Sequence, residues 1–340
     1  MILAHFTTDE NAQYFACGYS CDHAIFLELG GEAFFITDAR YTLEARTAIQ
    51  NAEVIEASDL WQALIEKISS GLKEIHFDPA QLSVQAYERL RKALPDLKLI
   101  GELDYHRKQR MVKTPKQIAL IQKAQELNRG AYKAFAQYLH TAHTPSEHFL
   151  QFKVKEFLTH SGEFDLSFEP IVAINANAAK PHALPSKDPL KVGDLLLVDV
   201  GLKYERYCAD RTRTARFGEG FSFSKDQSFE DKELQKIYDV VRKAQEYTIT
   251  NLRAGMTGQK IDSLARGVIE KAGFGAYFAH STGHGIGLDI HELPFISQRS
   301  QTIIEEGMVF SVEPGIYIPG KYGVRIEDLV AVQDSRAVVL

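Results

Sequence analysis

Two glutamates in the segment VEPGIYIPGKYGVRIED (312–328) are spaced so that they could share one chemical task. The segment reads as two strands around a Pro-Gly turn, and a turn centred on Gly320 pairs Glu313 with Glu327. Like charges directly opposite each other on neighbouring strands destabilise a hairpin. The pair therefore indicates an exposed sheet rim, a protonated acid, or a site where a bound cation compensates both carboxylates.

A second acidic pair occupies a comparable place earlier in the chain. In LLLVDVGLKYERYCADRTRT (195–214), a turn between Tyr204 and Glu205 would set Asp199 opposite Asp210. Unpaired carboxylates are costly to bury, so two such pairs in apolar strands favour bound cations. An oxygen-rich set of this kind suits Mn²⁺ better than a thiolate-selected Zn²⁺. Two ions about 3.5–4 Å apart can share one hydroxide nucleophile.

Three histidines lie in the short segment HSTGHGIGLDIHELP (280–294), and one of them could complete this ligand set. They are His280, His284 and His291, and the glycines between them favour backbone folded closely around a bound group. The alternative is a polar, Gly-rich loop with incidental histidines. His182, in AAKPHALPS, is a further candidate, for which an ordinary loop histidine is the alternative.

The elements that must position these residues fall into two regions, 1–111 and 112–340, of an α/β (α+β) protein. The first region alternates strand-like and helical runs, which predicts a small α/β domain. Its predicted strands and helices lie over 23–29, 32–37 and 74–79, and over 59–72 and 84–94, respectively. The second region opens on a long helix with Thr114 as N-cap, Pro115 at N1 and Gln117 at N3.

The second region repeats one order of elements. A second helix starts at Thr144, Pro145 and Glu147 and ends near Gly162. A further long helix then ends near residue 255, and a shorter one over 258–273 precedes the second hairpin. Because long helix, short helix and acidic hairpin recur in that order, the sequence predicts an internal duplication.

Composition bounds the class of protein. The chain has 340 residues, 45% hydrophobic and 25% charged, which is typical of a globular protein with a substantial core. A net charge of -6 without a basic block argues against nucleic-acid binding. The N-terminus lacks a basic signal-peptide region, the apolar runs are too short to cross a membrane, and three cysteines make no disulfide framework. These features predict a cytoplasmic protein without a membrane partner.

Region 112–340 resembles the pita-bread metallopeptidases, a family that includes methionine aminopeptidase, Xaa-Pro aminopeptidase (aminopeptidase P) and Xaa-Pro dipeptidase (prolidase). The motifs LLLVDVG, YCADRTRT, TGHGIGLDIHE, GMVFSVEPGIY and GVRIED carry the resemblance, in the family's order. It implies a pita-bread catalytic domain with an internal pseudo-twofold repeat. It also implies that the smaller, creatinase-like N-terminal domain limits substrate length and helps to form a homodimer.

The resemblance implies a dinuclear site with five metal ligands. Asp210 and Glu327 would bridge two divalent ions, Asp199 would hold one ion, and His284 with Glu313 would hold the other. Mn²⁺ is the expected metal, with Co²⁺ or Zn²⁺ as alternatives.

The same resemblance implies roles for residues around the metals. His182 and His291 match the histidines that contact the substrate and stabilise the reacting amide, and His280 matches a further substrate-site histidine. Glu313 would relay a proton from the nucleophilic water to the leaving nitrogen. His182, His291 and Glu313 are therefore the expected catalytic residues.

Two features favour the proline-specific branch, namely the extra N-terminal domain and Arg325. Arg325 lies two residues before Glu327, on the same strand face, and can pair with a substrate carboxylate or carbonyl. The alternative is a counter-ion for the acid cluster, and the two roles are compatible. Tyr317 is a candidate substrate-site residue, with cross-strand packing as its alternative.

We therefore expect a metal-dependent exopeptidase that removes the N-terminal residue from short Xaa-Pro peptides, an Xaa-Pro aminopeptidase. Xaa-Pro dipeptidase is the alternative. Methionine aminopeptidase is disfavoured by the N-terminal domain, and a non-catalytic binding protein by the complete ligand set.

Overall fold

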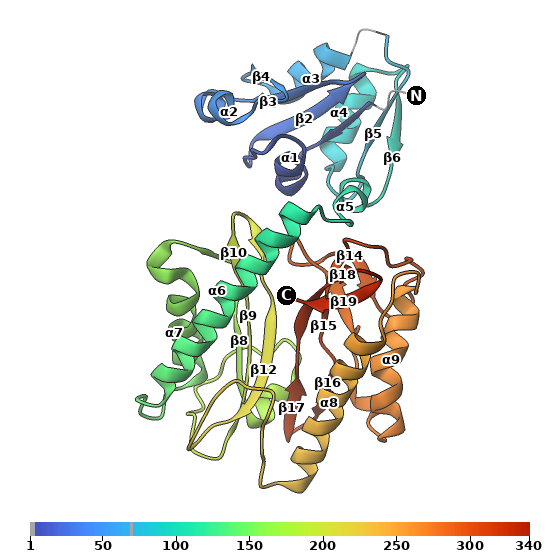
Figure 1. The fold of residues 1–340 in the computed structure, drawn as a ribbon. Coiled ribbons are helices and arrows are strands. Elements are labelled where there is room, and N and C mark those ends of the chain that lie inside the picture. The colour runs from blue at the N-terminus through green and yellow to red at the C-terminus, as the bar shows by residue number, and fades with distance from the viewer. Residues whose placement is uncertain (1–3, 69–70) are drawn as a thin grey trace. The chain divides into compact units, whose positions relative to one another are not determined.

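Residues 4–68 and 71–340 are described by the computed structural model, in which the chain divides into two units, Met1–Arg110 and Met111–Leu340 (Figure 1). The end of the helix predicted over 59–72 includes residues 69–70, which lie outside the described residues. No helix in the described part of the chain is long and apolar enough to cross a membrane.

The first unit is a mixed α/β domain. Six strands among its described residues form one sheet in the order β4-β3-β2-β1-β5-β6. Its elements are β1 (His5–Thr7), α1 (Glu10–Cys17), β2 (Ala24–Leu29), β3 (Glu32–Thr37), α2 (Thr42–Ala48), β4 (Glu53–Glu56), α3 (Leu60–Ile68), β5 (Glu74–Phe77), α4 (Val84–Ala93), β6 (Lys98–Gly101) and α5 (Tyr105–Gln109). The predicted strands and helices of this region are confirmed, apart from small differences at their ends.

The second unit contains the repeated order of elements. Its first half comprises α6 (Pro115–Leu139), α7 (Glu147–Thr159), β7 (Asp165–Leu166), β8 (Ile171–Ile174), β9 (Leu195–Val200), β10 (Leu202–Tyr204), β11 (Tyr207–Cys208) and β12 (Arg211–Arg216). Its second half comprises α8 (Lys232–Asn251), α9 (Gly258–Lys271), β13 (Gly283–Gly285), β14 (Glu292–Ile296), β15 (Val309–Val312), β16 (Gly315–Ile318), β17 (Tyr322–Arg325), β18 (Asp328–Gln333) and β19 (Arg336–Val339). Short 3-10 turns lie at His160–Gly162, Asn175–Ala179 and Gly275–Tyr277. In each half a long and a short helix precede an interrupted hairpin.

The helix starts test the capping predictions. At α6, Thr114 accepts a hydrogen bond from the Gln117 backbone N–H, and the Gln117 side chain accepts one from the Thr114 N–H, as predicted. At α7 the prediction was wrong, because Ser146 is the N-cap. Thr144 has a positive φ of 42°, and the Glu147 carboxylate accepts from the buried backbone N–H of Ile174 instead of closing a capping box.

The second acidic hairpin has the predicted register. Ile318 pairs with Tyr322 around Gly320, whose φ of 74° suits glycine, and Val312 pairs with Asp328 in the same register. Glu313 and Glu327 lie between these two paired stretches, at opposite positions.

The predicted register of the first acidic hairpin was wrong. Its turn consists of Glu205 and Arg206, both with positive φ, and Asp199 pairs with Thr212 instead of Asp210. The partner position moves by two residues, which leaves side chains on the same sheet face. Asp210 thus becomes a diagonal neighbour of Asp199.

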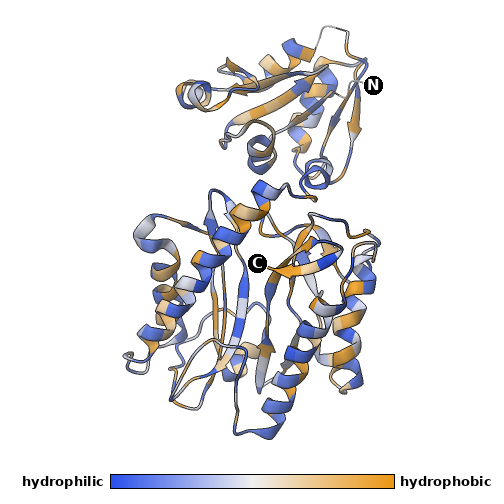
Figure 2. Ribbon diagram, viewed as in Figure 1, coloured by the Kyte–Doolittle hydropathy of each residue, from blue (hydrophilic) through white to orange (hydrophobic). Residues whose placement is uncertain are grey.

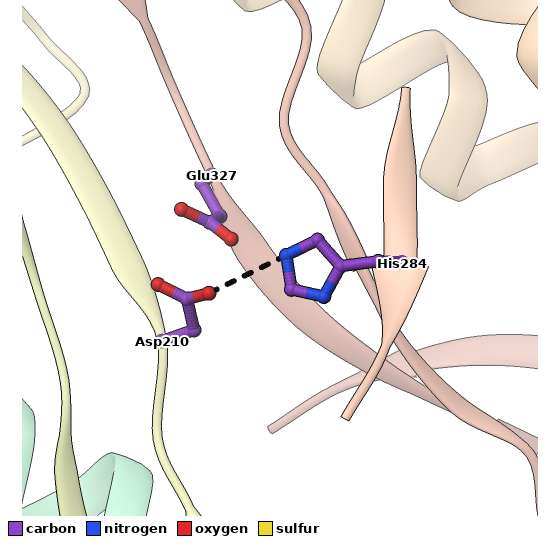
Figure 3. Close-up of side chains that lie close together, drawn as sticks. All are labelled: Asp210, His284 and Glu327. Atoms are coloured by element: carbon purple, nitrogen blue, oxygen red, sulfur yellow. Dashed lines mark ion pairs between the residues drawn. The ribbon is translucent and has the colours of Figure 1, made fainter. Parts of the chain in front are cut away.

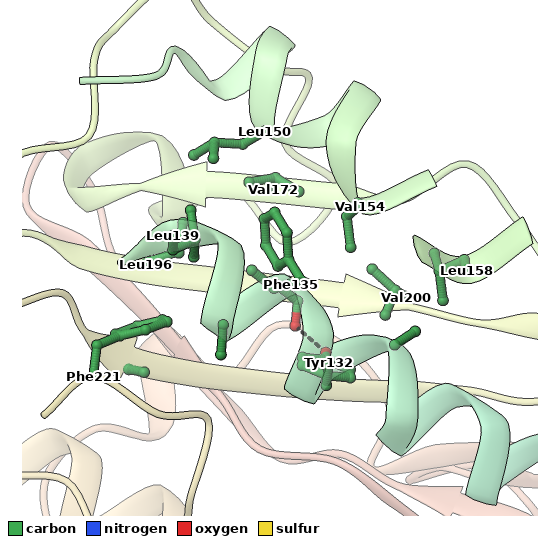
Figure 4. Packing of buried hydrophobic residues seen from close by; sticks show 14 of the residues in the cluster. Tyr132, Phe135, Leu139, Leu150, Val154, Leu158, Val172, Leu196, Val200 and Phe221 are labelled. Carbon is green, nitrogen blue, oxygen red and sulfur yellow. Dashed lines mark hydrogen bonds between the residues drawn. The ribbon is translucent and has the colours of Figure 1, made fainter. Parts of the chain in front are cut away.

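Helix α6 and the sheet of β8, β9 and β12 enclose one of the main cores. Phe135, Leu139, Val172 and Leu196 are buried there (Figure 4). Hydrophobic and hydrophilic positions alternate along α6 and α8 (Figure 2), as expected for helices with one buried face. The Tyr132 hydroxyl lies 2.7 Å from the Val198 carbonyl and 2.6 Å from that of Arg211, so it joins α6 to β9 and β12.

A buried ion-pair network connects the two halves. The Asp328 carboxylate on β18 lies 2.6 Å from Arg213 Nη2 and 3.1 Å from Arg211 Nη2, both on β12. Lys225 and Gln245 contact its other oxygen at 2.5 and 2.8 Å. Burial opposes ionisation of Asp328, but these cations outweigh burial and hold its pKa well below the usual range.

Replacing Asp328 with Ala should lower the free energy of unfolding by about 3–5 kcal/mol, because Arg213 would remain buried without its counter-charge. Urea unfolding followed by far-UV circular dichroism measures this loss. The control is Glu233→Ala, which removes an exposed ion pair with Lys321 and should move the unfolding midpoint very little. Equal midpoints for the two variants would contradict the prediction.

Candidate metal centre

The four predicted carboxylates and His284 line one pocket of about 350 Å³ in the second unit. The structure also places four other predicted site residues in its lining, namely His182, His280, His291 and Arg325. Tyr317 is not among the lining residues.

The second hairpin opens at its two glutamates, and this opening turns both side chains toward the pocket. The backbone N–H of Glu313 donates to the Thr282 carbonyl at 2.8 Å, and that of Glu327 donates to the Thr212 carbonyl at 3.1 Å. Each glutamate therefore leaves its own hairpin partner and bonds to a neighbouring segment. This break in the hairpin brings Glu313 and Glu327 close to the strands that carry Asp199 and Asp210.

His284 reaches the carboxylates because β13 packs closely against β15. A Cβ on Gly283 would lie 1.9 Å from the Ser311 carbonyl oxygen, so only glycine permits this approach. The His284 backbone N–H donates to Ser311 Oγ at 3.0 Å. Its ring Nδ1 lies 3.1 Å from the Gly285 carbonyl; with the proton on Nδ1, Nε2 is free to bind a metal.

Asp210, His284 and Glu327 form the tightest group of candidate ligands. Their ligand atoms all lie within 4.8 Å of one another, and the three side chains point toward a common space (Figure 3). His284 Nε2 lies 3.6 Å from Asp210 Oδ2 and 3.3 Å from Glu313 Oε1.

Three buried carboxylate oxygens have unsatisfied bonding capacity that bound cations could fill. Asp199 Oδ1, Asp210 Oδ1 and Glu327 Oε1 are buried and have no hydrogen-bond partner within the described part of the chain. Buried oxygens of this kind are costly when they lack a partner. The donor set, four carboxylates and one imidazole, suits divalent ions that prefer oxygen ligands.

The electrostatics of the carboxylates differ with their partners. Burial and neighbouring carboxylates raise the pKa of Asp210 and of Glu327 well above the ordinary values. Burial also opposes ionisation of Glu313, but the hydrogen bond and charge of His284 outweigh it and lower the pKa of Glu313 to about 2. The same pairing raises the pKa of His284 against the effect of burial. Bound cations would favour the ionised form of all the acids.

Arg325 acts within the acid cluster, in agreement with the counter-ion alternative. Its Nη2 lies 2.7 Å from Asp199 Oδ2, its Nε donates to Thr212 Oγ1 at 3.0 Å, and its Nη1 donates to the Tyr317 hydroxyl at 2.8 Å. The guanidinium is 3% exposed. Tyr317, buried behind Arg325, orients this side chain from outside the pocket lining.

Thr212 is a site residue that the sequence reasoning missed. Its hydroxyl donates to Glu327 Oε2 at 2.7 Å while it accepts from Arg325. The signal was available, because Thr212 follows Asp210 by two residues and strand alternation puts both on one face. The partner glutamate, 115 residues away, could not be identified in this way.

The remaining histidines surround the acids. The His291 ring stands edge-on to that of His284, with 4.3 Å between ring centroids, and His280 Nε2 lies 2.8 Å from the Tyr317 hydroxyl. Burial lowers the pKa of His280, and burial with the neighbouring His284 lowers the pKa of His291 to about 4. His291 is therefore neutral near pH 7.

Thr212→Val should destabilise the protein by about 1–3 kcal/mol, because valine keeps the shape but leaves buried atoms of Arg325 and Glu327 without a partner. Thr212→Ser retains the hydroxyl and should restore most of the loss. Chemical unfolding of both variants measures the difference. Equal stabilities would show that the hydroxyl contributes little.

Comparison with known proteins follows the division of the chain. Residues 119–334 match Metallopeptidase family M24, and residues 2–112 match the Creatinase/Prolidase N-terminal domain. An Xaa-Pro dipeptidase from Lactobacillus helveticus is 32% identical over 96% of this chain and 89% of its own length.

Solved structures agree with these matches. An Xaa-Pro dipeptidase from Bacillus anthracis has a TM-score of 0.90 at 32% identity, covering 99% of this chain and 92% of the other. An X-Pro aminopeptidase from Thermotoga maritima has a TM-score of 0.87 at 31% identity, covering 99% and 95%. The predicted fold class and the resemblance to proline-specific pita-bread peptidases are confirmed. The chain therefore belongs to metallopeptidase family M24.

Proposed function

We propose that this metallopeptidase hydrolyses the Xaa-Pro bond at the N-terminus of short peptides. The observation that carries the proposal is the pocket in which four carboxylates and His284 converge, with three buried carboxylate oxygens lacking protein partners. Xaa-Pro peptidases among the relatives and structural neighbours support the choice of substrate class.

Five side chains would hold two divalent ions, for which we propose Mn²⁺. Asp199, Asp210, His284, Glu313 and Glu327 would together hold the ions. Such ions polarise a scissile carbonyl and lower the pKa of a bound water.

Glu313 is the proposed proton carrier. Its carboxylate is ionised near neutral pH and lies in the pocket lining beside the other candidate ligands, which is where a proton carrier has to be. Ser311 Oγ donates to its Oε1 at 3.1 Å and fixes its orientation. Passing a proton to the proline nitrogen would complete hydrolysis, because a peptide nitrogen has to gain a proton to leave as an amine.

The histidines in the lining would bind and orient the peptide. Neutral His291 can donate a ring N–H to the oxygen that gains negative charge during attack on the carbonyl. His182 lies in the same lining and would assist it, and His280, held against Tyr317, would contact the substrate.

One feature of the pocket supports our choice of an aminopeptidase over a dipeptidase. A dipeptidase has to accommodate the C-terminal carboxylate of its substrate beside the reacting bond. Arg325 is the one Lys or Arg among the described lining residues, and Asp199 already pairs with it. A longer peptide places its C-terminal carboxylate farther from the reacting bond. There the lack of a free cation in the pocket weakens substrate binding less.

Xaa-Pro dipeptidase is the second candidate. The Lactobacillus helveticus relative and the Bacillus anthracis structure both carry that name, at about one-third identity.

We also propose that the chain functions as a cytoplasmic homodimer with a catalytic domain over 112–340. The N-terminal domain over 1–111 would limit substrate length and contribute to the dimer. The match of residues 2–112 to the Creatinase/Prolidase N-terminal domain supports this assignment.

Glu327→Ala should abolish stable metal loading and lower kcat/KM by more than about 100-fold. Mutating even a residue that only hydrogen-bonds to a metal ligand lowers metal affinity or activity about 10–100-fold. Elemental analysis and Xaa-Pro hydrolysis, with and without chelator, measure both effects. Glu305→Ala removes an exposed acid and is the matched control. Full activity of Glu327→Ala would exclude the proposed site.

Ala-Pro-Ala should be cleaved with a kcat/KM about tenfold or more above that of Ala-Pro, because the dipeptide carboxylate would lack a charged partner. Steady-state kinetics on the two peptides, with the same metal and pH, give the ratio. The opposite preference would identify a dipeptidase and leave the proposed metal chemistry intact.

A further inference from the structure

A second pocket, of about 290 Å³, lies on the other face of β12 and is lined by positive charges. Arg129 and Lys133 from α6, and Arg211 and Arg213 from β12, contribute to it together with Ser222 and Phe223. Along β12, Thr212 and Thr214 bond to Glu327 and Arg325 on the acidic side. Because successive strand residues face opposite ways, the two arginines point away from the metal site.

The positive charge of this second pocket exceeds its negative charge. Arg211 and Arg213 both pair with one oxygen of Asp328, and Lys225 pairs with the other. Arg129 donates to the Leu340 carbonyl oxygen, and Lys133 has no ion-pair partner in the described part of the chain. Three cations thus share the single carboxylate of Asp328, while Arg129 and Lys133 pair with no Asp or Glu in the described part of the chain.

The walls of the pocket combine buried and accessible charges. The Arg213 side chain is 3% exposed and that of Arg211 15%, so the floor excludes most water and strengthens attraction for an anion. Lys133 and Ser222 are exposed at the rim, where a ligand can enter. The Phe223 ring packs edge-on against that of Tyr132, with 5.0 Å between ring centroids, and supplies an apolar wall.

We propose that this pocket binds a phosphate group, either inorganic phosphate or a phosphate monoester. A doubly charged oxyanion matches the excess of cations better than a single carboxylate does. The planar forks of Arg211 and Arg129 suit phosphate oxygens, Lys133 adds a mobile charge, and the Ser222 hydroxyl can donate a hydrogen bond. β12 separates this pocket from the acidic one, so its ligand is not the peptide substrate.

The test is titration of the full chain with inorganic phosphate, followed by calorimetry at constant ionic strength. Lys133→Ala should weaken binding about three- to fivefold, as expected for an exposed charge, and Arg211→Ala about tenfold. The matched control is Lys123→Ala, which removes another lysine of α6. Lys123 does not line the pocket and pairs with Glu126, so this variant should bind phosphate like the unmodified chain.

Two further arms identify the source of the signal. Phosphate also binds metal ions, so the pocket should still bind it in Glu327→Ala; loss of all binding in that variant would assign the phosphate to the metal site and overturn the proposal. Adenosine monophosphate binding more tightly than phosphate would indicate a monoester ligand, and equal or weaker binding would indicate inorganic phosphate.

Two other results would also overturn the proposal. One is the absence of binding by both probes at millimolar concentrations, and the other is unchanged affinity in Lys133→Ala and Arg211→Ala. If Arg211→Ala does not fold, Lys133→Ala decides alone, because Lys133 is exposed and its removal breaks no described ion pair.

Discussion

Mutual repulsion among four carboxylates in one pocket is the constraint on which the catalytic unit depends. Two of the acids have charged protein partners: Asp199 pairs with Arg325 at 2.7 Å, and Glu313 with His284 at 3.3 Å. Asp210 shares the same imidazole at 3.6 Å, and Glu327 has no charged side-chain partner in the described part of the chain; the pKa values of both acids are raised. The protein therefore neutralises part of the charge itself and leaves a site whose remaining charge and unpaired oxygens suit divalent ions.

The duplicated architecture makes this arrangement possible. Each half contributes one hairpin, and neither hairpin alone could hold two ions. Contacts of Thr212 with Glu327, and of Arg213 with Asp328, join β12 to the second hairpin on both of its faces. Strand alternation separates the two kinds of contact, so that acids and threonines meet on one side and arginines on the other. The same division creates the cationic pocket behind the candidate metal centre.

Local chemistry explains which predictions succeeded. The start of α6 depends on Thr114, Pro115 and Gln117, which lie within four residues of one another. The register of the second hairpin depends on Gly320, which suits the left-handed turn. The first hairpin offered no such glycine. Glu205 and Arg206 adopt positive φ there, and propensity gave no reason to place the turn at them.

The sequence by itself determined the family, through its motifs, and the position of both acidic segments and the register of the second hairpin, because turn residues and strand alternation are short-range properties; the set of five candidate ligands followed from the family resemblance. Only the tertiary structure decided the partners of those residues. Arg325 pairs with Asp199, 126 positions away, so it balances charge inside the acid cluster while it lines the pocket. The roles of Thr212 and Tyr317 likewise depend on strands brought together by folding, since hydrogen bonding at about 3 Å requires contacts that sequence spacing does not encode.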